Sequence, residues 1–252
     1  MSLFFRKYGS GEALVILHGL FGSSMNWNSI GKKLSNNYSV YLVDQRNHGK
    51  SFHSDDFNYE ILSNDLNEFM IENQIEQAHL LGHSMGGKAS LQFAFDYPEK
   101  VKSLAIVDIG LKKFRFQDSE LLQAMIDLDL DIVKSRKEID EQLKEKIPEF
   151  ALRQFIMQNI HRSKEGSFDW RMNLSVLANN IKEVGAEIDA KGVFAQPTLF
   201  IRGSKSDYIL DEDMIELKKY FENVSFETIK DAGHWVHFDN PNDFLSLVEE
   251  FL

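Results

Sequence analysis

Short apolar runs alternate along the chain with segments of helical spacing, and this alternation restricts the possible folds more than any other feature. The runs are typical of strands buried on both faces, and they cover residues 13–17, 40–43, 78–81, 104–107 and 198–201. Helices are expected over residues 24–34 and 59–73, from residue 84, after residue 210 and from residue 241. Such strands form a mostly parallel sheet covered by helices, so we predict an α/β fold.

The alternation is interrupted once, between about residues 111 and 190. No parallel-type strand is visible there, and charged helical patterns cover residues 120–130 and 134–147. Because so long a departure from alternating strands and helices is unusual, we predict an all-helical cap, or lid, over one edge of the sheet. The core then consists of residues 1–110 and 191–252. The alternative is that the helices of this segment belong to the layers of the core.

Composition narrows the function classes. The 252 residues suffice for one large domain with a small lid, and 28 basic against 39 acidic residues give a net charge of −11 that disfavours binding to nucleic acid. Cysteine is absent, which excludes disulfide frameworks, thiol catalysis and cysteine-ligated zinc. No apolar run approaches the roughly 18 residues of a membrane-spanning helix. The apolar stretch before Arg6 is too short, and the charge of Arg6 comes too early, for a signal peptide. We therefore expect a cytoplasmic protein without a membrane segment.

The sequence Gly82-His83-Ser84-Met85-Gly86 follows a predicted strand and opens a predicted helix, which is the context that gives a G-x-S-x-G motif its meaning. The two glycines leave room for the neighbouring strand and helix, so the serine hydroxyl can stand at the carboxyl end of the sheet. Ser84 is the predicted nucleophile, and the backbone N–H of Met85 is a predicted oxyanion donor. The alternative is that Ser84 is an ordinary helix N-cap.

A serine hydroxyl is a poor nucleophile at neutral pH and needs a base within hydrogen-bond distance. His234 is the predicted base, because it follows the last predicted strand, residues 224–229, and completes the chain order of serine, acid and histidine. His83 is expected to point away from the exposed side of the turn, and His18 to brace a nearby loop. His234 and His237 do not form an H-E-x-x-H metal motif, so we expect neither a metal nor a cofactor.

A second glycine-rich turn, His18-Gly19-Leu20-Phe21-Gly22, ends the first predicted strand. In the predicted fold it lies at the same sheet edge as the serine, and its glycines permit a close approach of the backbone. The backbone N–H of Leu20 is therefore the second predicted oxyanion donor. Taken alone, the segment could equally be a strand-to-helix turn that binds nothing.

The sequence leaves two candidates for the acid that orients the base. The commoner hydrolase arrangement places it three residues after Gly203, where this chain has Ser206, so Asp207 is one residue out of frame. Asp108 ends a predicted strand directly and is favoured on that ground, with Asp207 kept as the alternative. Asp44 also ends a strand, and we interpret it mainly as part of a hydrogen-bonded loop, with a contact to substrate as the alternative.

With these motifs in place, the chain resembles the α/β-hydrolase superfamily over essentially its whole length and, more narrowly, the YbfF-type bacterial esterases. Arg-Asn-His-Gly at residues 46–49 and Ser-Met-Gly-Gly-Lys at residues 84–88 narrow the match, since G-x-S-x-G alone names only the superfamily. Further matching segments are residues 18–22, 58–59, 107–109, 170–173 and 233–237. The resemblance implies an eight-stranded sheet, a helical cap and hydrolysis of carboxylic esters, with acyl-CoA thioesters among the substrates.

The resemblance also implies Ser84 and His234 as nucleophile and base. Similar esterases use the aspartate that matches Asp108, which favours this residue as the acid. The chain departs from their pattern at Asp207, where a neutral residue is more usual, so a competing acid stays open. It also lacks the proline often found just after the matching aspartate.

We therefore expect a serine carboxylesterase that hydrolyses small acyl esters through a Ser-His-Asp triad and an acyl-enzyme intermediate. Its partners are expected to be its small-molecule substrate and at most copies of itself, as a monomer or small homo-oligomer. The alternatives are a carbon–carbon bond hydrolase or lyase on the same triad and a ligand receptor without catalysis.

Substrate choice is expected to depend on the cap. Its apolar residues form either the core of the cap or the wall of a pocket, and they are Phe114, Phe116, Leu121, Met125, Phe150, Phe155, Met157 and Trp170. A basic cluster of Lys112, Lys113 and Arg115 is a candidate contact for the anionic part of an acyl-CoA, and the alternative is a solvated helix start.

Overall fold

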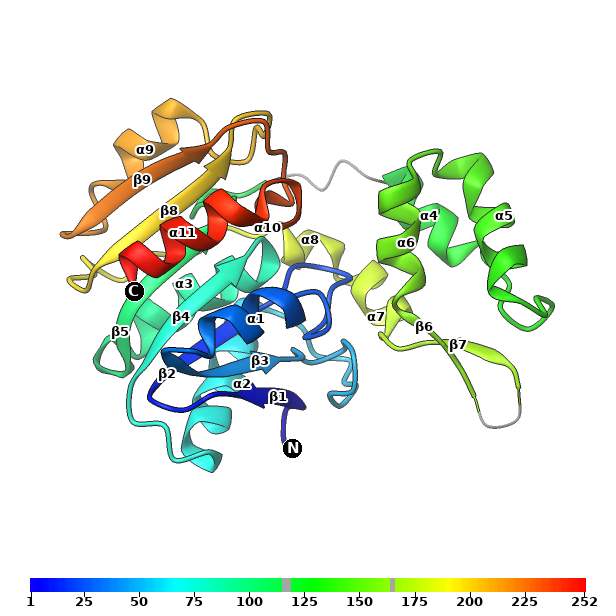
Figure 1. The fold of residues 1–252 in the computed structure, drawn as a ribbon, viewed down its shortest axis with the longest axis horizontal. Helices are drawn as coiled ribbons and strands as arrows, with labels where there is room; N and C mark the ends of the chain where they lie inside the picture. The colour runs from blue at the N-terminus through cyan, green and yellow to red at the C-terminus, as the bar shows by residue number, and fades with distance from the viewer. Residues whose placement is uncertain (115–118, 164–165) are drawn as a thin grey trace.

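A mostly parallel sheet of seven strands forms the centre of the computed structural model, which describes residues 1–114, 119–163 and 166–252 (Figure 1). The strands lie in the order β1-β3-β2-β4-β5-β8-β9. Only the edge strand β1 is antiparallel to its neighbour. Their bounds are β1 Phe5–Tyr8, β2 Glu12–Leu17, β3 Tyr38–Val43, β4 Ala78–His83, β5 Val101–Val107, β8 Thr198–Gly203 and β9 Val224–Ile229.

The predicted α/β fold is confirmed, but the expected number of eight strands is wrong for the described residues. The main sheet ends at β1 on one side and at β9 on the other. Two further strands, β6 (Ile160–Arg162) and β7 (Phe168–Trp170), pair only with each other. Their hydrogen-bonding groups are used in this separate antiparallel ribbon, so they add nothing to the main sheet.

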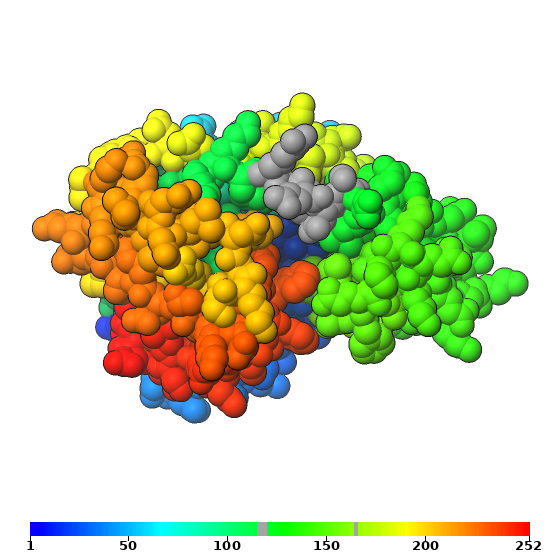
Figure 2. Space-filling model, turned by 90° about the horizontal axis from the view of Figure 1, so that it is seen from above, coloured from blue at the N-terminus to red at the C-terminus, as the bar shows by residue number. Residues whose placement is uncertain are grey.

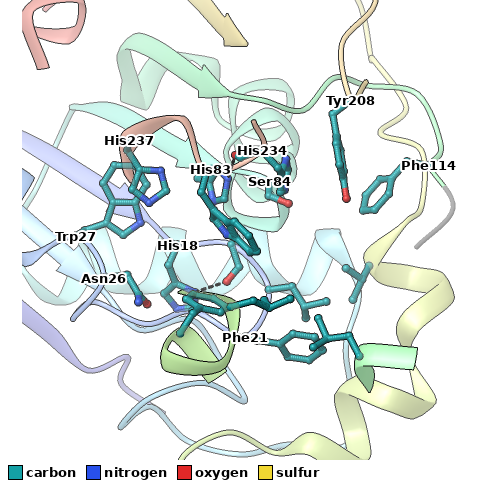
Figure 3. A pocket seen from close by; sticks show the side chains of 18 residues that line it. His18, Phe21, Asn26, Trp27, His83, Ser84, Phe114, Tyr208, His234 and His237 are labelled. Atoms are coloured by element: carbon teal, nitrogen blue, oxygen red, sulfur yellow. Dashed lines mark hydrogen bonds between the residues drawn. The ribbon is translucent and has the colours of Figure 1, made fainter. Parts of the chain in front are cut away.

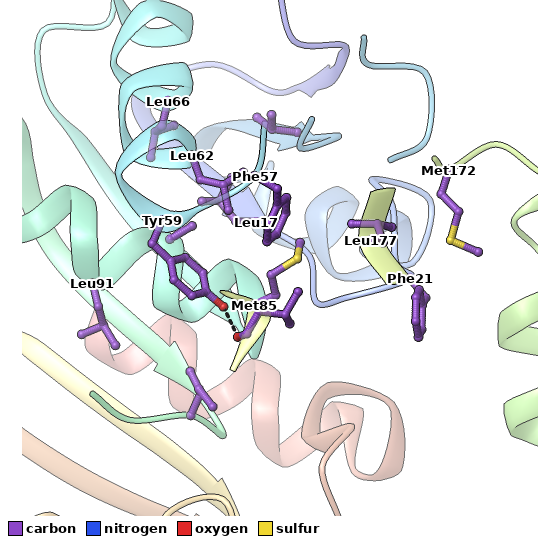
Figure 4. Packing of buried hydrophobic residues seen from close by; sticks show 14 of the residues in the cluster. Leu17, Phe21, Phe57, Tyr59, Leu62, Leu66, Met85, Leu91, Met172 and Leu177 are labelled. Carbon is purple, nitrogen blue, oxygen red and sulfur yellow. Dashed lines mark hydrogen bonds between the residues drawn. The ribbon is translucent and has the colours of Figure 1, made fainter. Parts of the chain in front are cut away.

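Helices cover both faces of the sheet because successive residues of a strand face opposite sides. Leu14 and Ile16 pack in one buried cluster with residues of α1 (Asn28–Leu34) and α11 (Pro241–Phe251). Val15 and Leu17 pack in another with residues of α2 (Tyr59–Glu72) and α3 (Met85–Asp96), and Figure 4 shows part of this cluster with Leu17 labelled. This two-sided burial explains the continuous apolar runs in the sequence. The covering helices are α1 Asn28–Leu34, α2 Tyr59–Glu72, α3 Met85–Asp96, α9 Asp211–Leu217, α10 Val236–Asp239 and α11 Pro241–Phe251; a short 3₁₀ turn, Pro98–Lys100, precedes β5.

The predicted elements are present, with differences at their ends. Helix α1 begins at Asn28 and not at residue 24, because residues 24–27 form a turn in which the side chain of Asn26 accepts a hydrogen bond from the backbone of Ser23. Helix α11 begins as the sequence indicates, with Asn240 capping the backbone N–H of Asp243. The edge strand β1 was not indicated by the apolar pattern, since it is only partly buried.

The segment between β5 and β8, here called the cap (residues 111–190), lies to one side of the sheet (Figure 1). Its helices α4 (Ser119–Ile126), α5 (Arg136–Lys146) and α6 (Phe150–Met157) lie farthest from the sheet. The expectation of an all-helical insertion is wrong, because β6 and β7 form a hairpin in which Gly166 has a φ of +96°. The predicted helix over residues 120–130 ends earlier, at Ile126. The helices are α4 Ser119–Ile126, α5 Arg136–Lys146, α6 Phe150–Met157, α7 Leu174–Asn179 and α8 Ile181–Val184.

The cap is tied to the core where the chain leaves and re-enters it. Near these points the two ends of the cap are joined to each other, because the backbone of Ile188 donates to the carbonyl of Leu111 and that of Phe114 donates to the carbonyl of Gly185. Tyr59 from α2 donates its hydroxyl to the carbonyl of Val184 (Figure 4). A hollow separates α4–α6 from the C-terminal part of the core in the space-filling view, with the N-terminal segment at its base (Figure 2). Among the described residues, no helix combines the length and apolar character needed to cross a lipid bilayer.

Candidate active site

Ser84 occupies a strained turn between β4 and α3. Its φ of +51° lies in the left-handed region, which residues with a side chain rarely adopt. The flanking glycines are required by close contacts: a Cβ atom at Gly86 would lie 2.4 Å from the carbonyl oxygen of Leu17, and one at Gly82 would lie 2.4 Å from that of Gly86. The Ser84 side chain makes no capping hydrogen bond to α3, so the alternative of an ordinary N-cap is wrong. The serine lines a pocket instead (Figure 3).

His234 and Asp108 are brought together although they are far apart in sequence. Nδ1 of His234 lies 2.7 Å from Oδ2 of Asp108, and His234 lines the same pocket as Ser84 (Figure 3). Asp108 follows β5, is fully buried and has a φ of +52°, and its backbone N–H donates to the carbonyl of Ile201 in β8. The contact lets the carboxylate hold the Nδ1–H tautomer of the imidazole, which leaves Nε2 available as an acceptor.

One group from the last residue of β8 and one from the loop after it complete the surroundings of Asp108. The backbone N–H of Gly203 donates to Oδ1 at 3.1 Å, and the hydroxyl of Ser206 donates to Oδ2. In the described part of the chain, Asp207 is exposed and makes no hydrogen bond or ion pair with another residue. Sequence reasoning missed the role of Ser206, although its spacing from Gly203 was the signal that could have found it.

Aromatic rings fix the position of the His234 imidazole. Tyr208 stacks on it with ring centroids 3.9 Å apart, and the ring of His83 lies 4.8 Å away. The expectation that His83 points away from the site is wrong, because it lines the pocket and its Nε2–H donates to the carbonyl of His234 at 2.9 Å. Burial holds the pKa of His83 well below 6.5, so the ring is neutral and adds no charge beside His234.

His237 does not form a metal pair with His234. Its ring stacks on Trp27 with centroids 4.0 Å apart, and burial lowers its pKa to about 3. Across residues 1–114, 119–163 and 166–252, no group of three or more His, Cys, Asp or Glu side chains is arranged to hold a metal ion.

The turn after β2, residues 18–22, is held by a set of hydrogen bonds and is called here the oxyanion loop. His18 braces it as expected: its Nδ1–H donates to the carbonyl of Gly19, and its Nε2 accepts from the backbone of Gln45. Gly22 also donates to the Gly19 carbonyl at 2.9 Å. A Cβ atom at Gly19 would lie 3.3 Å from the Cβ of Ser84, so the loop packs directly against the serine.

Two backbone N–H groups next to the serine have no acceptor in the protein. Among the residues that the structure describes, neither Leu20 nor Met85 donates a backbone hydrogen bond. Met85 is the first residue of α3, where the N–H groups have no intrahelical partner and the helix dipole is positive. Both groups therefore remain able to bind a negatively charged oxygen.

Asp44 belongs to a hydrogen-bonded loop, as predicted. It is buried, and its two carboxylate oxygens accept from the backbone N–H groups of Ser24, at 2.6 Å, and Lys50, at 2.9 Å. Gly49 adopts a φ of +59° directly beside this carboxylate. All of its contacts are internal, so a contact to substrate is not indicated.

The pocket above Ser84 is lined on one side by residues of the cap. Its cap wall is apolar and consists of Phe114, Leu121, Leu152, Phe155 and Val184. Of the other cap residues considered from sequence, Met125 and Met157 are buried and Phe150 is 65% exposed, whereas Phe116 and Arg115 lie outside the described residues.

The fold and this site together define a class of protein. A serine on a strained strand-to-helix turn, with a histidine and a carboxylate at the same edge of a mostly parallel sheet, is the arrangement found in serine hydrolases. A family model described as alpha/beta hydrolase fold matches residues 12–241, and the chain belongs to this family.

Individual relatives agree with this assignment. The chain is 36% identical to the sn-1-specific diacylglycerol lipase ABHD11 of Danio rerio, covering 97% of this chain and 79% of the relative. It is 28% identical to esterase YbfF of Escherichia coli, covering 95% and 92%. A solved structure of a marine microorganism esterase matches with a TM-score of 0.97 at 40% identity, covering 100% of this chain and 99% of the other. The protein is thus a serine hydrolase of the esterase and lipase type, which removes the alternative of a receptor without catalysis.

Proposed function

We propose that the protein is a serine carboxylesterase in which Ser84 is the nucleophile, His234 the base and Asp108 the acid of the triad. The observation that carries this proposal is the contact of the buried Asp108 with His234, which lines the same pocket as Ser84. Ser84 Oγ attacks the acyl carbonyl while His234 Nε2 accepts its proton, and the backbone N–H groups of Leu20 and Met85 bind the oxyanion.

The remaining steps follow from the same residues. When the tetrahedral intermediate collapses, the protonated His234 delivers its proton to the leaving alkoxide, and the acyl group stays on Ser84 as an ester. A water molecule then gives a proton to His234 Nε2 and attacks the acyl carbon, and the acid product leaves with regeneration of the Ser84 hydroxyl. Asp108 stabilises the imidazolium in both halves of the cycle without taking its proton.

Uncharged acyl esters are the proposed substrates. The pocket wall from the cap is apolar, and relatives carry names such as diacylglycerol lipase and esterase. Acyl-CoA thioesters are less well supported, because Lys112 is paired with Asp213 at 2.6 Å and lies beside an acidic surface of Glu187, Asp189 and Glu216. The candidate basic cluster therefore offers little positive charge to the anionic part of such a substrate.

We also propose that residues 111–190 act as a cap that selects the substrate, with residues 1–110 and 191–252 as the catalytic core. The cap supplies five of the pocket residues, all of them apolar, and the core supplies the serine, the histidine and the oxyanion loop. The catalytic groups and the specificity-determining surface then come from different parts of the chain.

The central test replaces Ser84 by alanine and measures hydrolysis of nitrophenyl esters of graded acyl length. We expect a fall in kcat of at least about 10⁴-fold with an unchanged melting temperature. Near-normal turnover by Ser84→Ala would falsify the proposal. Feeble turnover of all the esters by the unchanged protein would favour carbon–carbon bond hydrolysis on the same triad.

The acid is tested by a matched pair of substitutions. Asp108→Asn is expected to lower kcat by roughly 10⁴-fold, because the neutral amide no longer stabilises the imidazolium or the required tautomer. Asp207→Asn removes the same charge from an exposed loop residue and is expected to leave kcat unchanged. A large loss in Asp207→Asn with little loss in Asp108→Asn would reverse the assignment.

A further inference from the structure

We propose that Asn159, a residue of the cap, is a positioning residue that aims the oxyanion donor of Leu20. The oxyanion hole is then fully formed only when the cap is seated on the core. This inference rests on the proposed function, because it concerns the same oxyanion site.

The contact that carries the inference joins the end of α6 to the oxyanion loop. The side-chain amide of Asn159 donates a hydrogen bond to the carbonyl of Phe21, and Asn159 is 3% exposed. Its backbone carbonyl accepts from the N–H of Arg171 at 2.6 Å. Arg171 directly follows β7, so this hydrogen bond fixes Asn159 to another segment of the cap. The cap therefore contacts the oxyanion loop through the side chain of Asn159, which is buried and held in place by its own backbone hydrogen bond.

Two peptide groups relay this contact to Leu20. The Phe21–Gly22 peptide accepts from Asn159 at its carbonyl and donates at its N–H to the carbonyl of Gly19. That carbonyl belongs to the Gly19–Leu20 peptide, whose N–H is the proposed oxyanion donor. Because a trans peptide is planar with its N–H and C=O on opposite sides, fixing the Gly19 carbonyl fixes the direction of the Leu20 N–H.

The loop needs such support because Phe21 is strained. Its φ of +59° lies in the left-handed region, which a bulky side chain adopts only when its surroundings enforce it. From the core, the Phe21 N–H donates a hydrogen bond to Nε2 of His48 at 3.3 Å, and His18 Nδ1–H donates to the Gly19 carbonyl at 2.8 Å. Burial lowers the pKa of His48 to about 3, so its Nε2 remains an acceptor at neutral pH. The constraint on the carbonyl side of Phe21 comes from Asn159.

The neighbouring residue of the cap provides a matched control. Oε1 of Gln158 accepts from the side-chain amide of Asn26 at 2.9 Å, which is also a contact between cap and core. Asn26 lies outside the oxyanion loop, and this hydrogen bond involves none of the peptide groups that connect Asn159 to Leu20. Gln158→Leu therefore removes a cap contact of the same chemical kind without releasing the loop.

The experiment compares Asn159→Leu and Asn159→Asp with Gln158→Leu in the full chain. Each is assayed for kcat and KM on a nitrophenyl ester and for inhibition by a trifluoromethyl ketone with the same acyl chain. This ketone forms a hemiketal oxyanion with the serine, whereas its secondary alcohol analogue occupies the pocket without forming one. We expect both Asn159 variants to lose roughly 10- to 100-fold in kcat and in affinity for the ketone, with KM and affinity for the alcohol changed less than about twofold.

Other outcomes overturn the inference. Equal weakening of ketone and alcohol would mean that Asn159 only maintains the cap, and kcat values equal to those of Gln158→Leu would mean that the Phe21 contact does not matter. If Asn159→Leu does not fold, Asn159→Ser, which is smaller and keeps a hydroxyl, is used in the same comparison. Failure of the underlying function is recognised separately, because Ser84→Ala would then remain active whatever the Asn159 variants do.

Discussion

The hydroxyl of Ser206 donates a hydrogen bond to the same carboxylate oxygen of Asp108 that lies 2.7 Å from Nδ1 of His234. Ser206 thus occupies the loop position at which the commoner arrangement has the acid, and it contacts Asp108, the proposed acid, which follows β5. The oxygen of Ser206 also accepts from the backbone of Tyr208, whose ring stacks on the imidazole. One side chain therefore links the carboxylate to the loop that holds the base in place.

Ser206→Ala is expected to lower kcat by roughly 10- to 100-fold while KM changes little. A hydrogen bond to a charged group contributes about 1.5–3 kcal/mol, and about 1.4 kcal/mol corresponds to a factor of ten in rate. Ser204→Ala is the control, because Ser204 lies in the same loop and its hydroxyl contacts the backbone of Asp231. Steady-state kinetics on one ester separate the two, and equal losses in both variants would mean that only the loop conformation matters.

Gly86→Ala is expected to destabilise the protein by roughly 1–3 kcal/mol and to lower activity, because the added Cβ meets the carbonyl oxygens of Leu17 and His18 at 2.4 and 2.6 Å. Backbone atoms of β2 cannot move aside without shifting the oxyanion loop. At Gly110 the nearest atom to an added Cβ is 3.9 Å away, so Gly110→Ala should be nearly neutral. Urea denaturation of both variants checks this; comparable stability losses would contradict the packing argument.

Phe155→Ala is expected to shift the preference towards longer acyl chains. Phe155 lines the pocket from α6, with its ring 5.7 Å from that of Trp235, and its removal opens apolar space near the serine. Each methylene that fills this space should raise kcat/KM by roughly fourfold, from about 0.8 kcal/mol of burial. Phe150→Ala truncates a 65% exposed residue of the same helix and should leave the chain-length profile unchanged. Identical profiles for Phe155→Ala and the unchanged protein would argue against this wall as the acyl site.

Lys88 is a buried lysine that joins the core to both ends of the cap. It lies in α3, and its ammonium group donates to the carbonyls of Leu111, Lys112 and Ala186 at 3.2, 2.9 and 2.7 Å. Burial lowers its pKa from 10.5 to about 7, against a smaller opposing effect of Glu187. In the unfolded chain the pKa returns to its ordinary value of 10.5.

This depressed pKa predicts how stability changes with pH. Between about pH 7 and 10 the unfolded chain holds more protons at Lys88 than the folded protein, so this residue makes the free energy of unfolding rise with pH, by at most about 1.4 kcal/mol per unit. Below pH 7 both states are protonated and the contribution is constant. Lys88→Met should remove this rise, whereas Lys113→Met, at an exposed position, should keep it. Urea denaturation at pH 7 and 9.5 tests the difference; parallel curves for all three proteins would refute it.

Features encoded within short segments could be predicted from the sequence. Apolar runs and paired glycines predict the strand at residues 78–81, the turn around Ser84 and the helix after it. The spacing of apolar residues and the residue preferences of turns act over only a few residues, so a single segment is enough to show them. The placement of His234 after the last strand followed from chain order. The resemblance implied the correct family, but it implied eight strands, whereas the main sheet of the described residues has seven.

Features that join distant segments were decided only by the tertiary structure. Asp108 and Asp207 both follow strands, and only the packed sheet brings one of them to His234, 126 residues further along the chain. The contact of Asn159 with Phe21 spans 138 residues and has no local signal in either segment. Local propensities determine which elements form, whereas the direction of a side chain at a strand end depends on how the neighbouring strands and the cap pack around it. The sequence therefore determined the sheet, the serine turn and the position of the histidine. The packing decided which carboxylate contacts the histidine, which hydroxyl contacts that carboxylate and which cap residue contacts the turn after β2.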